Sequence, residues 1–251
     1  MARPTPRTLH VLGKQRVTRN MLRITFGGAG MQAFPPDQPG AYIKLIFEGA
    51  DGAPALMRTY TVRAQRAEEI DVDFVLHEDG GPASRWAEHC EIGDAILVGG
   101  PGPRKPMVSD ADWHVVAGDM TALPAISANL EMLPQHARGV ALLEVIDRAD
   151  IQPLQVPPGF ELIWLINPHP GSEPGLLADQ MRQLDWPSGR VSVWAACEFA
   201  GMRALRQFLR EERAIARGDL YISSYWKLGV NEDQHKQEKR ADADQQDQRS
   251  A

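Results

Sequence analysis

The sequence changes character near residue 108, and no other feature limits the possible folds as strongly. Before this point short apolar segments alternate with turns, whereas beyond it apolar runs are separated by segments of helical periodicity. The stretch around Pro101, Pro103 and Pro106 is rich in glycine and proline, which is typical of a domain boundary. We predict one domain over residues 1–108, a second over 109–229, and a charged C-terminal helix or tail over 230–251.

The N-terminal part has the pattern of an antiparallel β-structure. In the segment 70–76 apolar residues recur at every second position, which is the period of a half-buried strand. Segments 21–26 and 42–47 are further apolar strands, and glycines follow each of them. Together with a short helix that begins near Pro82, this spacing predicts a small antiparallel barrel.

The second part alternates strands with helices. A helix is expected where Met202, Leu205 and Leu209 share one face. Five strands with intervening helices favour a doubly wound parallel sheet. The five apolar runs are 113–117, 140–143, 162–166, 191–195 and 220–223.

The C-terminal segment has no large apolar side chain beyond Asn231. Glu232, Lys236 and Arg240 are spaced four apart, which predicts a solvated helix at its start. We expect the segment from Asp242 onward to be disordered.

Composition excludes several classes of protein. Lysine and arginine number 27 against 33 aspartate and glutamate, a net charge of −6, whereas nucleic-acid and membrane-surface binders are usually basic. No apolar stretch approaches the ~18 residues of a membrane span, and no apolar segment follows the charged N-terminus. Two cysteines and seven histidines show no disulfide framework and no metal-binding spacing. We expect a cytoplasmic monomer without a metal site.

The segment Arg58–Arg63 is the strongest local motif. Arg58 can neutralise a phosphate, Tyr60 can stack on a flat heterocycle, and Thr61 can hydrogen-bond to the edge of that ring. The alternative interpretation is a strand whose alternate side chains happen to be polar.

A second motif joins a strand to a helix through Gly80 and Gly81. Free amides and the helix dipole favour a pyrophosphate at such a helix start, and the Ser84 hydroxyl can add a hydrogen bond. The alternative is an ordinary turn before a structural helix.

Polar residues also follow the predicted parallel strands. The segment Gly118–Thr121 opens a helix at the edge where open α/β sheets bind ligands, although it lacks the GxGxxG fingerprint. In the pair Asp147–Arg148, aspartate suits a ribose hydroxyl and arginine a 2′-phosphate, so the pair does not distinguish NAD from NADP. The alternative for both residues is a solvated loop.

These motifs, in this order, resemble the siderophore-interacting protein family, flavin-dependent ferric-siderophore reductases of the ferredoxin–NADP reductase-like superfamily. The resemblance covers about residues 7 to 240, and beyond the two motifs it includes Gly118–Ile126, Trp194–Glu198 and Tyr225–Gly229. It implies an N-terminal six-stranded FAD-binding β-barrel followed by an NAD(P)-binding domain built on a doubly wound parallel sheet.

The resemblance also implies roles for individual residues in binding FAD. The first motif would hold a phosphate, the isoalloxazine face and the flavin edge, and segment 75–84 would follow the ribityl chain and the pyrophosphate. Segment 121–122 would lie at the domain junction near the flavin. The implied FAD-binding residues are Arg58, Tyr60, Thr61, Val75, His77, Ala83, Ser84, Thr121 and Ala122.

NADPH or NADH is the implied electron donor. Cys197 and Glu198 would approach the nicotinamide, and Asp119, Asp147 and Arg148 complete the candidate contacts. From its spacing alone, however, Cys197 is better explained as a small buried residue at a strand end.

One position departs from the family pattern. The family commonly carries glutamate where this chain has Met120, so a role that needs a carboxylate is not carried over here.

Many ferric siderophores are anionic, and an acidic protein needs local cations to bind them. Lys44 and the C-terminal basic residues match positions where the family tends to carry positive charge. The alternative is that these side chains only improve solubility. The candidates are Lys44, Arg104, Lys105, Lys227, Lys236, Lys239 and Arg240.

The predicted function is reduction of a ferric siderophore by NAD(P)H through FAD, which releases Fe(II) and needs no catalytic side chain. Reduced ferredoxin is an alternative donor. Two other functions are weighed against this one: a general NAD(P)H–flavin or ferredoxin-linked oxidoreductase, and a non-enzymatic siderophore-binding flavoprotein.

Overall fold

The computed structural model describes residues 5–48, 55–77 and 80–249, with side chains described as far as residue 246. Contacts divide the chain into two compact units. The first comprises Met1–Pro106, Leu123–Leu133 and Asp147–Val156, and the second comprises Met107–Ala122, Pro134–Ile146 and Pro157–Ala251. The two short insertions mean that each unit is discontinuous in sequence.

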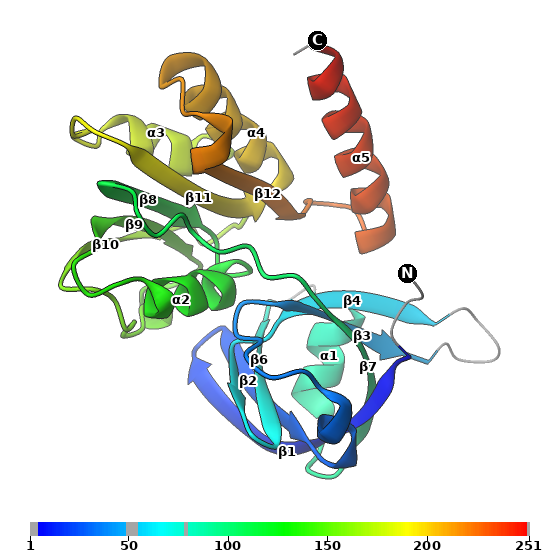
Figure 1. Ribbon diagram of the computed structural model, residues 1–251. Coiled ribbons are helices and arrows are strands. Elements are labelled where there is room, and N and C mark those ends of the chain that lie inside the picture. The colour runs from blue at the N-terminus through cyan, green and yellow to red at the C-terminus, as the bar shows by residue number, and fades with distance from the viewer. Residues whose placement is uncertain (1–4, 49–54, 78–79, 250–251) are drawn as a thin grey trace. The chain divides into compact units, whose positions relative to one another are not determined.

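The first unit is built on a curved antiparallel sheet (Figure 1). Its strand order is β4-β3-β7-β1-β2-β6-β5. The predicted antiparallel architecture is confirmed, but among the described residues the sheet has seven strands instead of six, one of them the three-residue β5 paired with β6. The strands are β1 (Arg7–Thr18), β2 (Met21–Gly27), β3 (Tyr42–Phe47), β4 (Leu56–Thr61), β5 (Ala64–Arg66), β6 (Glu69–Val75) and β7 (Ala95–Gly102).

Helix α1 (Pro82–His89) closes the core of this unit. Trp86 on α1 stacks on Phe26 at 6.1 Å between ring centroids and meets Phe47 edge-on at 5.7 Å. Phe26 and Phe74 are fully buried, and burial of each such side chain stabilises the fold by about 1.5–3 kcal/mol. This packing fixes the start of α1 beside the end of β6.

The first unit also includes helix α2 (Leu123–Met132) and the turn after strand β9 (Arg138–Val145). The run Leu123–Leu130 is buried throughout, and Glu131 forms an ion pair of 2.5 Å with Arg63. A 3-10 turn, η3 (Arg148–Asp150), follows β9, and its Asp150 is fully buried. Both insertions are therefore packed elements of the fold.

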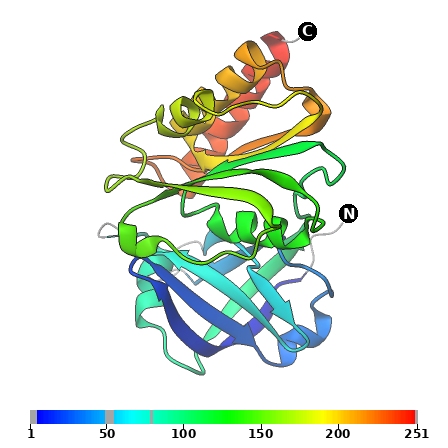
Figure 2. The ribbon, with the colours of Figure 1, turned by 90° about the vertical axis from the view of Figure 1, so that its left-hand side faces the viewer.

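The second unit carries the parallel sheet, whose order is β10-β9-β8-β11-β12 (Figures 1 and 2). All five predicted apolar runs form its strands, which confirms the predicted parallel sheet. Helices α3 (Leu176–Arg182) and α4 (Phe199–Gln207) lie together on one face of it (Figure 1). The strands are β8 (Trp113–Gly118), β9 (Arg138–Val145), β10 (Gly159–Ile166), β11 (Val191–Glu198) and β12 (Leu220–Trp226).

The strand order reverses between β8 and β11. The chain moves outward from β8 to β9 and β10, and it then returns to the other side of β8 with β11 and β12. Open α/β sheets bind ligands outside the carboxyl ends of the strands at this switch point. A ligand of this unit is therefore expected beside the residues that follow β8 and those that end β11.

Helix α5 (Glu232–Arg249) corrects one expectation. The predicted helix at Glu232 is present, but the disorder expected from Asp242 onward is wrong for Asp242–Arg249, which continue the helix. The Asp242 carboxylate forms two hydrogen bonds of 2.6 and 2.8 Å with the guanidinium of Arg206. A polar anchor thus replaces the apolar side chains that this segment lacks.

Cys90 and Cys197 are free and buried. Among the described residues, no helix is long and apolar enough to span a membrane. No group of three or more His, Cys, Asp or Glu side chains in that part of the chain is arranged to hold a metal ion.

Candidate functional site

The Arg-x-Tyr-Thr motif lies on strand β4, at the edge of the first unit's sheet. Arg58 and Tyr60 share one face of the strand because successive side chains alternate. Both are half-buried, and the Tyr60 ring lies 4.4 Å from the Phe74 ring, centroid to centroid. An aromatic face and a cation are thus fixed on the same side of an edge strand.

The second motif lies where β6 ends and α1 begins, and β6 is in contact with β4. The Ser84 hydroxyl donates to the Val75 carbonyl at 3.1 Å, and the Gly80 amide donates to the His77 carbonyl at 2.8 Å. Ala83 is buried and can offer only its backbone. The structure therefore brings Val75, His77, Ala83 and Ser84 together around one helix start.

Gly80 and Gly81 differ in the space around them. A Cβ at Gly80 would lie 3.1 Å from both the His77 carbonyl oxygen and the Ser84 Cβ, so the close turn disfavours a larger residue. A Cβ at Gly81 would meet nothing within 4 Å, so the space in front of the first turn of α1 is open. The first amides of a helix have no acceptor within the helix itself, so a helix start of this kind suits a phosphate group.

These features fit a flavin dinucleotide. The cation of Arg58 and the amides at the start of α1 suit its two phosphates, and the Tyr60 ring suits its flat heterocycle. Thr121 and Ala122, the remaining predicted FAD residues, belong to the second unit.

Asp119, directly after β8, accepts five hydrogen bonds from other residues of the second unit. Its Oδ1 accepts from the Thr121 amide (2.9 Å), the Thr121 hydroxyl (2.5 Å) and the Ala122 amide (3.3 Å). Its Oδ2 accepts from the Glu198 amide (2.9 Å) and the Trp226 indole (2.8 Å). Burial raises the pKa of Asp119, and the bonds from Thr121 and Trp226 act in the opposite direction. All five partners are donors, so the carboxylate form is the one this site satisfies.

Glu198, the last residue of β11, has a comparable role. Its carboxylate caps α4 by accepting from the Ala200 amide and, at 3.2 Å, from the Gly201 amide. Its other oxygen accepts from the Leu228 amide at 3.1 Å. Asp119 and Glu198 therefore tie together the segments that follow β8, β11 and β12.

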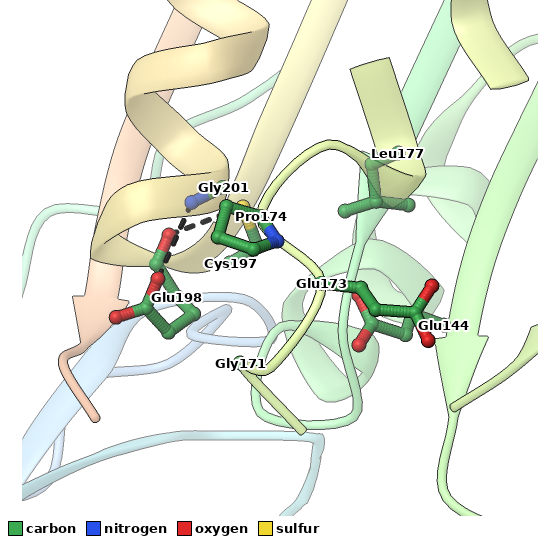
Figure 3. Close-up of a pocket in the computed structure, with 8 residues that line it drawn as sticks. All are labelled: Glu144, Gly171, Glu173, Pro174, Leu177, Cys197, Glu198 and Gly201. Atoms are coloured by element: carbon green, nitrogen blue, oxygen red, sulfur yellow. Dashed lines mark hydrogen bonds between the residues drawn. The ribbon is translucent and has the colours of Figure 1, made fainter. Parts of the chain in front are cut away.

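A small pocket opens beside these residues (Figure 3). Its wall combines the Cys197 thiol with three carboxylates, those of Glu144, Glu173 and Glu198. Burial raises the pKa of Glu144 to about 7, and the charge of Asp119 adds to this, whereas the hydrogen bond from the Asn167 amide (2.8 Å) opposes it. Burial raises the pKa of the Cys197 thiol well above its usual value. Cys197 is thus both buried and adjacent to the pocket.

Asp147 and Arg148, the other predicted donor contacts, belong to the first unit. Asp147 accepts from the Ala149 amide at 2.8 Å and pairs with Arg19 at 2.9 Å. Contacts assign segment 147–156 to the first unit, whereas Asp119, Cys197 and Glu198 belong to the second. Arg148 is exposed.

Five of the predicted siderophore-binding cations, Lys44, Arg104, Lys227, Lys236 and Lys239, have partners within the protein. In the first unit, Lys44 bonds to the Thr59 hydroxyl, and Arg104 pairs with Asp37 at 3.2 Å.

In the second unit, the three predicted lysines are all associated with α5. Lys227 pairs with Glu238, Lys236 pairs with Glu232 at 2.9 Å, and Lys239 donates to the Ser223 hydroxyl (2.7 Å) and the Ser224 carbonyl (2.8 Å). A ligand at any of these lysines must therefore compete with a partner inside the protein.

Sequence reasoning missed three residues of the second unit. Glu144 and Asn167 carry a signal that could have found them, because each lies at or just after the carboxyl end of an apolar run. Trp226 lies in the segment Tyr225–Gly229 that carries the resemblance, but the local sequence gives no signal of its bond to Asp119, which is 107 positions away in the chain.

Comparison with known proteins agrees with this architecture. The family profile "Siderophore-interacting protein" matches residues 111–229, and "Siderophore-interacting FAD-binding domain" matches residues 10–55 and 49–105. The chain is 37% identical to the ferric vibriobactin reductase ViuB of Vibrio cholerae over 262 residues, 96% of each chain.

Solved structures agree as well. The siderophore-interacting protein SipS from Aeromonas hydrophila superposes with a TM-score of 0.85 at 33% identity, covering 95% of this chain and 98% of that one. Ferredoxin–NADP+ reductase from Plasmodium falciparum shares the fold, with a TM-score of 0.65 at 13% identity and coverage of 88% and 96%. The predicted family and the ferredoxin reductase-like fold are confirmed.

Proposed function

The chain belongs to the siderophore-interacting protein family, and from this premise we propose that it is a flavin-dependent reductase of ferric siderophores. The observation that carries the proposal is the arrangement on β4 and α1, where a cation, an aromatic face and an open helix start lie together. The near full-length similarity to a ferric vibriobactin reductase supports the same reaction.

In this proposal Arg58 and the first amides of α1 bind the FAD phosphates, and Tyr60 packs against the flavin ring. Thr61 hydrogen-bonds to the flavin edge. FAD, when bound, supplies the conversion between a two-electron hydride donor and a one-electron acceptor. The protein itself binds and orients the cofactor, the electron donor and the acceptor, and it excludes water from them.

We assign the electron donor, NADPH or NADH, to the carboxyl edge of the parallel sheet. A small pocket lined by Cys197 and Glu144 lies at this edge. Asp119 and Glu198 have a supporting role, because their carboxylate oxygens already accept hydrogen bonds from backbone amides and the Trp226 indole. Asp119 therefore holds the segments around the site in place, and Glu198 does the same while also lining the pocket.

The substrate is a ferric siderophore whose oxygen donors bind Fe(III) much more tightly than Fe(II). Reduction of the iron therefore releases it, and no protein nucleophile or acid is required. We place the reaction in the cytoplasm, carried out by a monomer, with reduced ferredoxin as the alternative donor.

An anaerobic absorbance titration tests the proposal. Protein loaded with FAD receives NADPH or NADH, and the flavin band should bleach with at least one of them. Addition of a ferric siderophore with an Fe(II)-trapping chelator should then restore the band as Fe(II) appears. Bleaching without Fe(II) release would favour a general flavin oxidoreductase, and protein that takes up no flavin would refute the proposal.

A further inference from the structure

The C-terminal helix α5 is docked almost entirely by polar contacts. Its side chains include no large apolar residue, yet His235 is buried against Phe199 and bonds to the Ser224 hydroxyl at 2.8 Å. Lys239 donates to the Ser223 hydroxyl and the Ser224 carbonyl, both on β12. These contacts hold the helix along the end of β12.

Two ion pairs of α5 differ sharply in burial. Asp242 and Arg206 are each 11% exposed and form a two-point contact. Lys227 and Glu238 are 30% and 39% exposed. Exposed pairs contribute little to stability, whereas a buried two-point pair is costly to break. Glu238 can therefore leave Lys227 while Asp242, Lys239 and His235 keep the helix in place.

Lys227 itself is held in a defined position. The residue before it, Trp226, is bonded to Asp119, and the amide after it, from Leu228, is bonded to Glu198. Its ammonium lies 5.1 Å from the centroid of the Phe199 ring. The lysine is thus presented at the carboxyl edge of the sheet by two buried carboxylates.

We propose that Glu238 determines charge specificity by competing with anionic ferric siderophores for Lys227. The inference rests on the proposed function, the reduction of a ferric siderophore, and adds Lys227 as a residue that binds the chelate. A carboxylate and the anionic oxygens of a catecholate chelate offer the same kind of acceptor to an ammonium group. A chelate with enough negative charge displaces Glu238, whereas a neutral or cationic chelate gains nothing at Lys227.

The test measures binding, so that it does not depend on turnover. FAD-loaded protein is titrated with the trianionic iron(III) tris-catecholate complex and with a neutral iron(III) trihydroxamate, and quenching of tryptophan fluorescence reports Kd. Glu238→Gln should lower the Kd of the anionic complex about two- to fivefold, the range expected for an exposed ion pair. The Kd of the neutral complex should not change.

Two further variants isolate the pair. Asp244→Asn removes the same charge from an exposed position on the same helix and should leave both Kd values unchanged. Lys227→Met should weaken binding of the anionic complex, and Glu238→Gln should have no further effect in that background. Equal effects of Glu238→Gln and Asp244→Asn, or an undiminished effect of Glu238→Gln without Lys227, would overturn the inference.

The donor supplies the last control. If Glu238→Gln tightens binding of NADPH but not of the iron complex, Lys227 serves the nucleotide and the inference is wrong. Failure of the wild-type protein to release Fe(II) would instead refute the proposed function, while the binding comparison would still decide the role of Glu238.

Discussion

The flavin-side motif of the first unit and the carboxyl edge of the second use their polar residues in opposite ways. Arg58, Tyr60 and Thr61 are half-buried and His77 is exposed, so their polar groups can reach a ligand. Asp119 and Glu198 are only 5% and 6% exposed, and their oxygens accept hydrogen bonds from the protein itself. In the proposed function, residues of the first kind bind the cofactor, and residues of the second kind hold the shape of the surface around them.

Replacement of Asp119 should have the largest effect. In Asp119→Asn the new amide group would face hydrogen-bond donors that need an acceptor, so unfolding free energy should fall by about 3 kcal/mol. Urea denaturation, monitored by tryptophan fluorescence, measures this change in unfolding free energy. Asp147→Asn, at a more exposed ion pair, should change stability by less than about 1 kcal/mol. Unchanged stability with a raised KM for NADPH would make Asp119 a ligand contact.

The sequence predicts the elements of this comparison better than the roles of its residues. The alternation in 70–76 and the five apolar runs follow from local periodicity, and they correspond to β6 and to the strands of the parallel sheet. The burial of Asp119 does not follow from local periodicity, since its partners, the Glu198 amide and the Trp226 indole, lie 79 and 107 positions away. The order of α5 beyond Asp242 likewise depends on a distant arginine, Arg206.

Replacement of Arg58 should have the next largest effect, which is on the affinity for FAD and not on the stability of the fold. Arg58→Ala should weaken FAD binding about tenfold or more, because a charge-assisted contact to phosphate is lost. Within the fold its guanidinium donates to the neighbouring Met57 carbonyl, so the unfolding midpoint should change little. Flavin fluorescence measures the Kd, with Arg16→Ala, an exposed arginine of β1, as the matched control. Equal Kd values for the two variants would contradict the assignment of β4.

The docking of α5 should depend on pH. Burial lowers the pKa of His235, and Lys239 lowers it further, while Glu232, Glu198 and Glu238 act in the opposite direction. The unfolded or undocked segment therefore takes up a proton first, at the ordinary histidine pKa of about 6.5, and docking weakens as the pH falls below that value.

Hydrogen exchange measures this effect. Amides of α5 should be less protected at pH 5.5 than at pH 7.5 after correction for intrinsic exchange rates, and His235→Gln should remove the difference. Equal protection of the wild-type helix at both pH values would show that His235 does not control docking.

The smallest effect is expected at the cysteines. Both thiols are buried and burial raises the pKa of each, so neither should react appreciably with iodoacetamide in the native protein at pH 8. Mass spectrometry before and after unfolding counts the labelled thiols. Rapid labelling of Cys197 in the folded protein would place it on an open surface of the donor site.

The stoichiometry of iron release tests the central claim most directly. Protein whose FAD has been reduced once, with excess donor removed, is mixed anaerobically with a ferric siderophore and an Fe(II)-trapping chelator. Because reduced FAD carries two electrons and each Fe(III) accepts one, we predict two Fe(II) per reduced flavin. Release of no Fe(II), with the flavin still reduced, would contradict the account.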